Sequence, residues 1–290
     1  MSKMNAQNIV EIVGKNLEMV KKYSERLLKG ESIAKEIFGK YNTELEGLIS
    51  DRVSEYSSNG ELARMESEAA KDLASWTEQS GRTQKYNAEE LAHERIVKEV
   101  GCAYRSEKEH ELAFANVLHQ SIVNYALRTE LAARMVEEGC AGNKLAVVEL
   151  SARISPGLTF HSASKYLSCV VIPYGTEARS AIGEQELDCS LVSFEAAYES
   201  AKNAAEKFGA NYVLAESSAA PSKRVMKSRK KPRVYFCTLT PSSDQKNSDQ
   251  ENNSHEKSTS YHEINTEFRD EFDSIVREIC FQKLTDMYLN

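Results

Sequence analysis

The residues that most often bind metals or form disulfides are dispersed along this chain. Its six cysteines lie far apart and form no C-x-x-C pair, so they fit neither a zinc site nor a disulfide framework. Its six histidines form no H-E-x-x-H motif or other metal spacing. His110 and His119 share one predicted helical stretch, where we expect structural or solvated side chains. The sequence therefore predicts reduced thiols, no metal site and no cofactor.

A basic cluster at 222–233, SerLysArgValMetLysSerArgLysLysProArg, carries seven positive charges. Two interpretations stay open for it: an exposed charged loop, or a patch that binds phosphate or serves nuclear import. The chain as a whole is acidic, because 37 Lys and Arg stand against 44 Asp and Glu, a formal charge of -7. A general nucleic-acid binder is therefore not expected.

Length and composition are those of a soluble globular protein. The chain has 290 residues, 41% hydrophobic and 28% charged, which is enough for one large domain or two ordinary ones. No apolar run approaches the roughly 18 residues that a membrane span requires, and the first residues, MSKMNAQN, lack the apolar stretch of a signal peptide. We expect an intracellular protein, located in the cytoplasm or, if the basic cluster acts in import, in the nucleus.

The first half of the chain has a helical pattern. All five prolines follow residue 155, so the punctuation that is common in mixed folds is missing before it. SerSerAsnGly at 57–60 and SerGlyArgThr at 80–83 predict helix breaks, and two further helices are expected at 87–100 and 106–138. An apolar residue recurs every seven positions in the first stretch, as a packed seam requires: Val13, Val20, Leu27, Ala34, Tyr41 and Leu48. This seam fits a coiled coil and a helical bundle equally well.

Beyond Gly142 the pattern changes to short apolar runs of the buried-strand type, at 145–150, 169–172, 211–215 and 233–239. An amphipathic helix is predicted at 193–208 and a terminal helix at 266–287. Residues 241–260 contain almost nothing apolar, so a polar, mobile loop is expected there. Strands that alternate with helices predict an α/β layer fold, which becomes α+β overall when the N-terminal helices are included.

Three segments of the second half carry a family resemblance. They are LeuAlaValValGluLeuSerAlaArg (145–153), TyrGlyThrGluAlaArgSerAlaIleGly (174–183) and AlaAsnTyrValLeuAlaGluSerSerAlaAlaPro (210–221). In order and spacing they resemble the first strand and turn, the Y-S-N-E-A-K segment and the A-D-x-x-x-x-x-S-G-I-A-G-P stretch of the CinA C-terminal family. The resemblance implies a CinA-like α/β domain at 125–290. Residues 1–124 are then a separate helical region, an arm for oligomerisation or for binding a partner.

The best-known members of that family are nicotinamide-nucleotide amidohydrolases, which use a serine nucleophile paired with a lysine. The pair is needed because a serine hydroxyl is a weak nucleophile until a base takes its proton. Aligned on Glu149, the nucleophile position of this chain reads Leu150, and two glycine positions read Arg153 and Ile154. Arg179 replaces the lysine, and arginine cannot be deprotonated to act as a base. The resemblance therefore implies the fold without the catalytic pair.

Other residues of the family's site are retained or displaced. Tyr174 and Glu177 match the family pattern. A one-residue slip at the strand end would put Ser151 in the nucleophile position, with Tyr174 and Arg179 as its catalytic companions and Glu149 as the base. If the site is instead degenerate, we expect Arg179 to form an ion pair with Glu149 or Glu177.

The leading hypothesis is a non-catalytic CinA-like scaffold or protein-interaction module, a pseudoenzyme that self-associates or binds a protein partner through 1–124. One alternative is a nicotinamide-nucleotide amidohydrolase-type enzyme that uses Ser151. Another is a nucleotide-binding sensor without turnover. Such a sensor would hold a phosphorylated small molecule in a degenerate pocket formed by Glu149, Arg153, Tyr174, Glu177 and Arg179.

Overall fold

The computed structural model describes the following parts of the chain: residues 6–80, 87–160, 162–173, 178, 190–221, 231–242 and 255–289, with side chains from residue 16 onward. The chain divides into two compact units. Unit 1 consists of residues 1–35 and 114–290, and unit 2 consists of residues 36–113. This grouping differs from the sequence-predicted domains 1–124 and 125–290, which stay a prediction about how the chain folds.

Unit 2 is made of helices. It contains most of α2 (Ile33–Asn59), all of α3 (Glu61–Ser80) and α4 (Ala88–Glu107), and the first turn of α5 (Glu109–Ala126). Gly60 separates α2 from α3 with a φ of +80°, a conformation that glycine adopts without steric cost. The predicted break at 57–60 is therefore confirmed. A capping box starts α4, because Asn87 accepts from the N–H of Glu90 at 2.8 Å and Glu90 accepts from the N–H of Asn87 at 3.1 Å.

The seven-residue apolar seam does not lie on one helix. Helix α1 (Ala6–Leu28) ends before Gly30, whose φ is +81°, and α2 begins at Ile33. Leu48, the last residue of the seam, is 44% exposed. The continuous seam predicted across 13–48 is thus wrong, because a glycine in the left-handed conformation ends the first helix midway.

The helix predicted at 106–138 is also divided. It consists of α5 and α6 (Glu130–Cys140), and residues 127–129 between them are not helical. The hydroxyl of Thr129 donates to the carbonyl of Ala126 at 2.7 Å, which satisfies one carbonyl at the end of α5. A threonine side chain that competes for the backbone in this way favours a helix end over a helix interior.

Unit 1 contains a five-stranded mixed sheet with the order β2-β1-β3-β4-β5. Its strands are β1 (Leu145–Val148), β2 (Leu167–Val171), β3 (Tyr212–Ala219), β4 (Arg233–Pro241) and β5 (His255–Glu263). Strand β1 runs parallel to both β2 and β3, whereas β3, β4 and β5 are antiparallel. The predicted α+β fold, with N-terminal helices before a layered α/β part, is confirmed.

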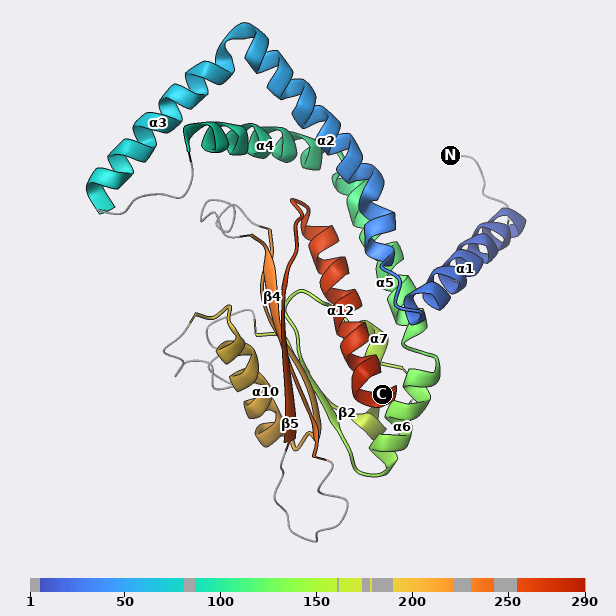
Figure 1. Cartoon of the computed structure of the whole chain (residues 1–290). Helices are drawn as coiled ribbons and strands as arrows, with labels where there is room; N and C mark the ends of the chain where they lie inside the picture. The colour runs from blue at the N-terminus through green and yellow to red at the C-terminus, as the bar shows by residue number, and fades with distance from the viewer. Residues whose placement is uncertain are drawn as a thin grey trace. The chain divides into compact units, whose positions relative to one another are not determined.

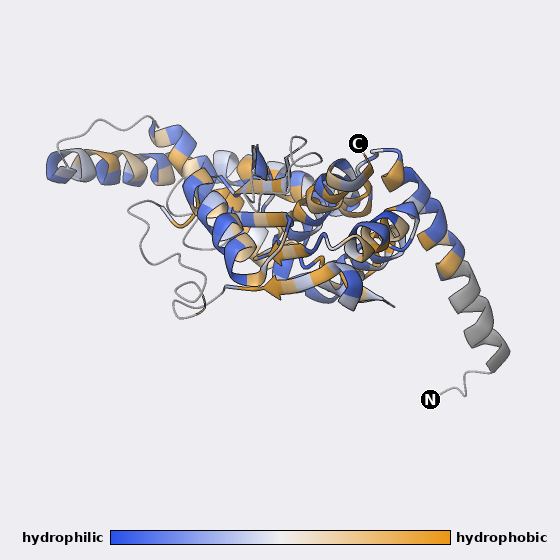
Figure 2. Cartoon of the chain, turned by 90° about the horizontal axis from the view of Figure 1, so that it is seen from below, coloured by the Kyte–Doolittle hydropathy of each residue, from blue (hydrophilic) through white to orange (hydrophobic). Residues whose placement is uncertain are grey.

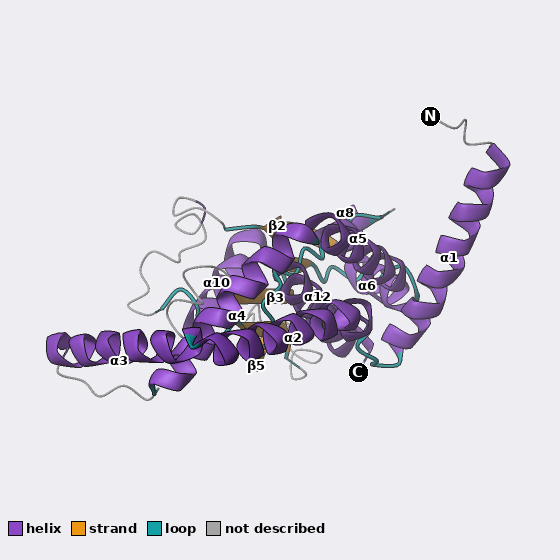
Figure 3. Ribbon diagram, turned by 90° about the horizontal axis from the view of Figure 1, so that it is seen from above, coloured by secondary structure: helices purple, strands orange, loops and turns teal. Residues whose placement is uncertain are grey.

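Helices cover both faces of this sheet (Figure 1). On one face, α10 (Phe194–Phe208) packs Ala197, Ala201 and Ala204 against β1, β3 and β4, and these small side chains let the helix approach the strands closely. On the other face, α12 (Arg269–Leu289) buries Phe272 and Phe281. Short helices α7 (Ser155–Leu158) and α8 (Ala163–Tyr166) follow β1. In the view from above, the strands are visible between α10 and α12 (Figure 3).

Hydropathy follows this layering. In Figure 2 the strands are rich in apolar residues, whereas the helices carry polar and apolar residues on different sides. All four residues of β1 are buried, as the apolar run at 145–150 predicts. In the described ranges, no helix is long and apolar enough to cross a lipid bilayer.

The polar loop predicted at 241–260 is partly wrong. Residues 255–263 form strand β5, which pairs with β4 along all nine residues, from Pro241 opposite His255 to Arg233 opposite Glu263. Its sequence contains no aliphatic residue, so it lacks the pattern of a buried strand. Because β5 lies at the edge of the sheet, six of its nine side chains are exposed and polar residues suffice. Residues 243–254 of the predicted loop lie outside the described residues.

Candidate functional site

The candidate site starts at the carboxyl end of β1, where the predicted residues 149–153 leave the sheet. We call residues 149–155 the β1 loop. Strand β1 pairs in parallel with β3, and Val148 lies opposite Ala215. The next residue of β3, Glu216, is therefore placed beside the first residues of the β1 loop. The carboxyl ends of parallel strands are where open α/β sheets commonly build their sites.

The carboxylate of Glu216 binds the backbone of the β1 loop. Its Oε1 accepts from the N–H of Leu150 at 2.9 Å and from the N–H of Ser151, and its Oε2 accepts from the N–H of Ala152 at 3.0 Å. Glu216 is 2% exposed. Burial raises the pKa of this carboxyl to about 7, although the three N–H donors act in the opposite direction. The loop is thus folded around an acid from the neighbouring strand.

A second buried carboxylate closes the β1 loop on itself. Oε2 of Glu149 accepts from the N–H of Ile154 at 2.7 Å and from the N–H of Ser155 at 3.3 Å. The backbone N–H of Glu149 donates to the carbonyl of Val171 at 3.0 Å, which extends the ladder between β1 and β2. Glu149 therefore holds the turn that carries the chain from β1 into α7.

Helix α12 supplies three charged side chains to the β1 loop. The buried Arg277 donates from Nε to the carbonyl of Ala152 at 2.8 Å. Asp273 accepts from Nε of Arg269 at 2.8 Å and lies 3.8 Å from a guanidinium nitrogen of Arg153. Burial lowers the pKa of Arg277 to about 10, which leaves it protonated at neutral pH, and burial raises the pKa of Asp273. One helix therefore anchors both the backbone and a side chain of the loop.

The hydroxyl of Ser151 is enclosed within this arrangement. Ser151 is 1% exposed, and its Oγ lies 2.8 Å from Oγ of Ser218 and accepts from Arg269 at 3.4 Å. Ser218 donates in turn to Oε1 of Glu216 at 3.3 Å. Two hydroxyls and a carboxylate of raised pKa form a chain that is able to carry a proton, and the hydroxyl of Ser151 lies buried within it.

The structure places some of the predicted site residues in the β1 loop, and others lie outside the described residues. Glu149, Ser151 and Arg153 all lie in the β1 loop, and the left-handed φ of Arg153, +48°, marks its tightest turn. Glu149 accepts from N–H groups of its own loop, and the guanidinium of Arg153 lies near Asp273 instead. The other predicted residues lie outside the described ranges: Tyr174, Glu177, Arg179 and, in the basic cluster, 222–230.

Sequence reasoning missed the residues that hold the β1 loop in place: Glu216, Ser218, Arg269, Asp273 and Arg277. One signal was present for Glu216, which follows the apolar run of β3 where a strand is still expected. Another was present on α12, where Asp273 and Arg277 share one face with Phe272 and Val276. Charged residues on an apolar stripe are seldom buried unless they are paired.

A second buried polar network lies next to the first. His119 of α5 is fully buried, with Nε2 at 3.0 Å from Oε1 of Glu278 and Nδ1 at 3.0 Å from a guanidinium nitrogen of Arg277. Because arginine is always a donor, Nδ1 accepts, Nε2 carries the proton and the imidazole is neutral. Burial lowers the pKa of His119, in agreement with that state.

Glu278 also caps the start of α2. Its Oε1 accepts from the N–H groups of Ile33 at 2.8 Å and Ala34 at 2.6 Å, and its Oε2 accepts from the hydroxyl of Ser32 at 2.9 Å. A carboxylate at a helix N-terminus satisfies free N–H groups and complements the helix dipole. Within unit 1, the residues just before and at the start of α2 are therefore tied to the C-terminal helix.

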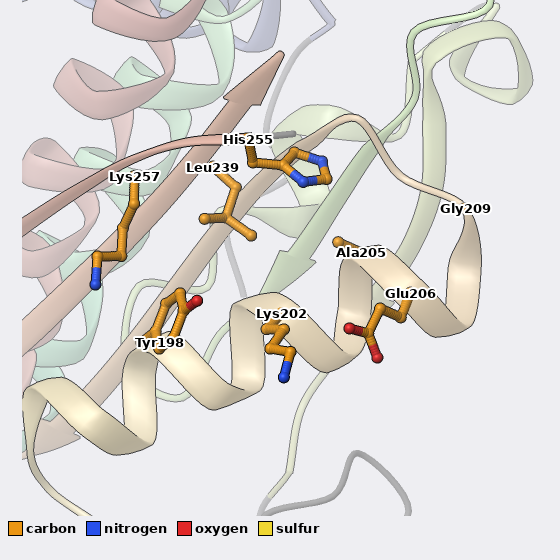
Figure 4. A pocket seen from close by; sticks show the side chains of 8 residues that line it. All are labelled: Tyr198, Lys202, Ala205, Glu206, Gly209, Leu239, His255 and Lys257. Carbon is orange, nitrogen blue, oxygen red and sulfur yellow. The ribbon is translucent and has the colours of Figure 1, made fainter. Parts of the chain in front are cut away.

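A cavity of about 340 Å³ lies between α10 and the strands β4 and β5 (Figure 4). Leu239 and Ala205 form its apolar part, and Lys257 places its ammonium 4.2 Å from the centre of the Tyr198 ring. The remaining lining residues are polar or lack a side chain: Lys202, Glu206, Gly209 and His255. A volume of this size suits a small ligand.

Thiols and possible metal ligands do not cluster in the described part of the chain. No group of three His, Cys, Asp or Glu side chains there is placed to hold a metal ion. Five cysteines are described, and all five are free. Burial raises the pKa of Cys237 to about 11, which keeps that thiol protonated and unreactive.

Comparisons with known proteins give a likeness of fold only. No family model matches the chain, and no curated protein matches it. The solved structures that are similar to it are described as members of the competence-damaged protein (CinA) superfamily or as competence or damage-inducible proteins. The resemblance expected from the sequence is thus also found by comparing structures, at low identity.

Three of these structures illustrate the extent of the likeness. The superfamily protein from Klebsiella pneumoniae 700603 is 13% identical, with a TM-score of 0.45, and covers 57% of this chain and 98% of its own. The protein from Enterobacter asburiae is 15% identical with the same TM-score and coverage. The protein from Agrobacterium tumefaciens is 18% identical, with a TM-score of 0.40, and covers 55% of this chain and 93% of its own.

Proposed function

We propose that this chain is a non-catalytic scaffold or protein-interaction module. The observation that carries the proposal is the closure of the β1 loop by its own chain. Three successive N–H groups of the loop are bound to Glu216, two more to Glu149, and the carbonyl of Ala152 to Arg277. These five N–H groups are used within the chain, so they are not available to bind a reacting group.

The environment of Ser151 argues in the same direction. An acting serine needs an adjacent base and access to its substrate. The described partners of its hydroxyl are Ser218 and Arg269, a hydroxyl and a guanidinium, and neither serves as a base at neutral pH. Glu216 lies one hydroxyl further along and already accepts three backbone N–H groups.

The helical region 1–124 is the proposed surface for self-association or for a protein partner. Support comes from apolar side chains that the fold leaves exposed. Phe114 and Val117, one turn apart on α5, are 69% and 60% exposed, and Trp76 of α3 is 40% exposed. Exposed apolar side chains on one helix face are typical of protein-binding surfaces.

A phosphorylated small molecule is a second candidate ligand. The cavity beside α10 is a better site for it than the β1 loop. Arg153 is drawn toward Asp273, whereas Lys202 and Lys257 line the cavity and form no ion pair with any described carboxylate. Inorganic phosphate should raise the melting temperature of the wild type but not of Lys257→Ala. Lys165→Ala, which changes a lysine that does not line the cavity, should respond like the wild type.

The scaffold proposal is tested by measuring ammonia release from nicotinamide mononucleotide. Wild type and Ser151→Ala should both match the protein-free blank. Turnover by the wild type that disappears in Ser151→Ala would establish the enzyme alternative instead.

The interaction surface is tested by affinity capture from native cells. The double variant Phe114→Ser with Val117→Ser should capture fewer partner proteins than the full-length wild type. If the surface serves self-association, light scattering should give a smaller particle mass for the variant than for the wild type. Ile172→Ser serves as the matched control. It also removes an exposed apolar side chain, 49% exposed, but Ile172 directly follows β2 and lies outside the helical region 1–124. Equal capture by all three proteins would contradict the proposed surface.

A further inference from the structure

Strand β5 is an edge of the sheet whose outer side has no partner strand among the described residues. It pairs with β4 along its full length, and β4 is its only partner in the described sheet. An edge strand presents a row of backbone N–H and C=O groups to another strand. Strand β5 is long for an edge, nine residues, and its exposed side chains include Lys257, Thr259 and Tyr261.

The two faces of β5 are clearly assigned. Residues with odd numbers lie on the α10 side, because Lys257 contacts the ring of Tyr198 and Tyr261 lies 6.4 Å from the ring of Phe194. Residues with even numbers lie on the α12 side, where the ring of His262 meets the edge of Phe236 at 5.9 Å. Two copies of β5 joined in one sheet must pair odd residues with odd and even residues with even.

The sequence of β5, HisGluLysSerThrSerTyrHisGlu, is complementary to its own reverse. In an antiparallel pair centred on Thr259, His255 lies opposite Glu263, and Glu256 lies opposite His262. Lys257 lies opposite Tyr261, where an ammonium and an aromatic ring attract each other. Each match occurs twice in a two-fold pair. Directly opposed side chains on one face are the contacts that stabilise antiparallel strands.

We propose that the outer edge of β5 pairs with the same edge of a second copy of this chain, antiparallel and centred on Thr259. The contact is isologous, as expected for a two-fold dimer. It joins two five-stranded sheets into one continuous sheet. The pairing does not depend on whether the β1 loop is catalytic, so it stands apart from the proposed function.

Neighbouring registers lack this complementarity. Centring the pair on Ser258 would place His255 opposite Tyr261 and Lys257 opposite Thr259, with no pair of opposite charges. Centring it on Ser260 would place Lys257 opposite Glu263, but it would remove both histidine–glutamate matches and the lysine–tyrosine match. Charged residues on an edge also deter unrelated strands. The Thr259 register therefore forms more complementary contacts than its neighbours, and this self-complementarity favours a second copy of β5 as the partner strand.

The pairing also completes the cavity beside α10. His255 and Lys257 line that cavity and lie on the odd-numbered face of β5. In the paired sheet, Glu263 and Tyr261 of the second copy come to lie opposite them. The second copy thereby contributes an acidic and an aromatic side chain next to the rim of the cavity.

Cysteine cross-linking tests the register directly. Thr259 faces its own equivalent across the two-fold axis, and directly opposed residues of antiparallel strands have Cα atoms about 4.5 to 5.5 Å apart, within the range for a disulfide. Full-length Thr259→Cys, with Cys102, Cys140 and Cys189 replaced by serine, should form a covalent dimer under mild oxidation. Ser258→Cys in the same background should remain monomeric alone and cross-link when mixed with Ser260→Cys. A monomeric Thr259→Cys, or equal cross-linking by Ser258→Cys alone, would overturn the proposal.

Charge exchange provides a second test. Glu256→Lys with Glu263→Lys places lysine opposite histidine, and His255→Glu with His262→Glu places glutamate opposite glutamate. Each variant alone should lose the dimer formed through β5 in light scattering, and an equal mixture should regain it as a heterodimer, because every contact is then complementary. A dimer formed by either variant alone, or no heterodimer on mixing, would refute the register. The cysteine experiment decides the question if a charge variant does not fold.

Discussion

The carboxylate of Glu216 accepts a hydrogen bond of 2.9 Å from the backbone N–H of Leu150, the residue at the position where the sequence resemblance expects a nucleophile. The difference at position 150 is therefore not confined to the side chain of Leu150. Its backbone belongs to a turn that wraps a buried acid, and the same acid also binds the next two N–H groups. The departure from the expected chemistry thus involves the fold of the loop as well as the identity of one side chain.

Restoring the family's side chains should consequently fail to restore activity. Leu150→Ser with Arg179→Lys supplies a serine and a lysine, but Glu216 still holds the loop N–H groups and Arg277 still holds the carbonyl of Ala152. Ammonia release from nicotinamide mononucleotide should stay at the level of the wild type. A clear gain in turnover would show that the loop is not closed.

Glu216 should make the protein less stable as the pH rises. Its pKa in the folded protein, about 7, lies above the value of 4.5 for an unperturbed glutamate, so the folded state binds more protons between these values. The free energy of unfolding should fall as the pH rises from 4.5 to 7, by on the order of 3 kcal/mol from this group. Buried histidines contribute with the opposite sign, so the comparison is made with Glu216→Gln. The difference between wild type and variant in urea unfolding should change over this range, and a constant difference would contradict the assignment.

His119 should be essential for the stability of unit 1. His119→Phe leaves Glu278 and Arg277 without their shared partner, and breaking a buried charged network in this way costs about 3 to 5 kcal/mol. Because burial lowers the pKa of His119 below 6.5, its contribution is present above that pH and is lost as the pH falls below it. The control is His110→Phe, an exposed position on the same helix, where a change within about 0.5 kcal/mol is expected. Thermal unfolding followed by circular dichroism compares the two, and equal losses would exclude the network as the cause.

Gly139 should not tolerate a side chain. A Cβ at this position would lie 2.4 Å from the carbonyl oxygen of Lys165 and 2.6 Å from Cα of Tyr166, both backbone atoms. Gly139→Ala should therefore cost about 1 to 3 kcal/mol through overpacking between α6 and α8. Gly47→Ala in α2, where no atom lies within 4 Å of a built Cβ, should be neutral or stabilising by up to about 1 kcal/mol. Urea unfolding of both variants provides the measurement, and equal effects would contradict the close contact.

Much of the secondary structure was predictable from local pattern. The apolar runs located β1 and the first half of β3, because strand residues buried on both faces of a sheet are mostly apolar. The amphipathic stretch at 193–208 predicted α10, and the structure adds Ser193 as its N-cap and Gly209, with a φ of +60°, at its end. Strand β5 escaped notice because an edge strand with exposed side chains needs no apolar residue.

By itself the sequence determined the strands β1 and β3 and the helix α10, and it placed three predicted site residues, Glu149, Ser151 and Arg153, in one loop after one strand. Only the tertiary structure decided what surrounds them. The partners of the β1 loop lie far away in the chain: Glu216 is 66 residues from Leu150, and Arg277 is 125 residues from Ala152. Local periodicity reports which face of an element is buried, but not which other element covers that face. The pairing of buried charges depends on sheet order and helix placement, and these arise only when the whole chain packs.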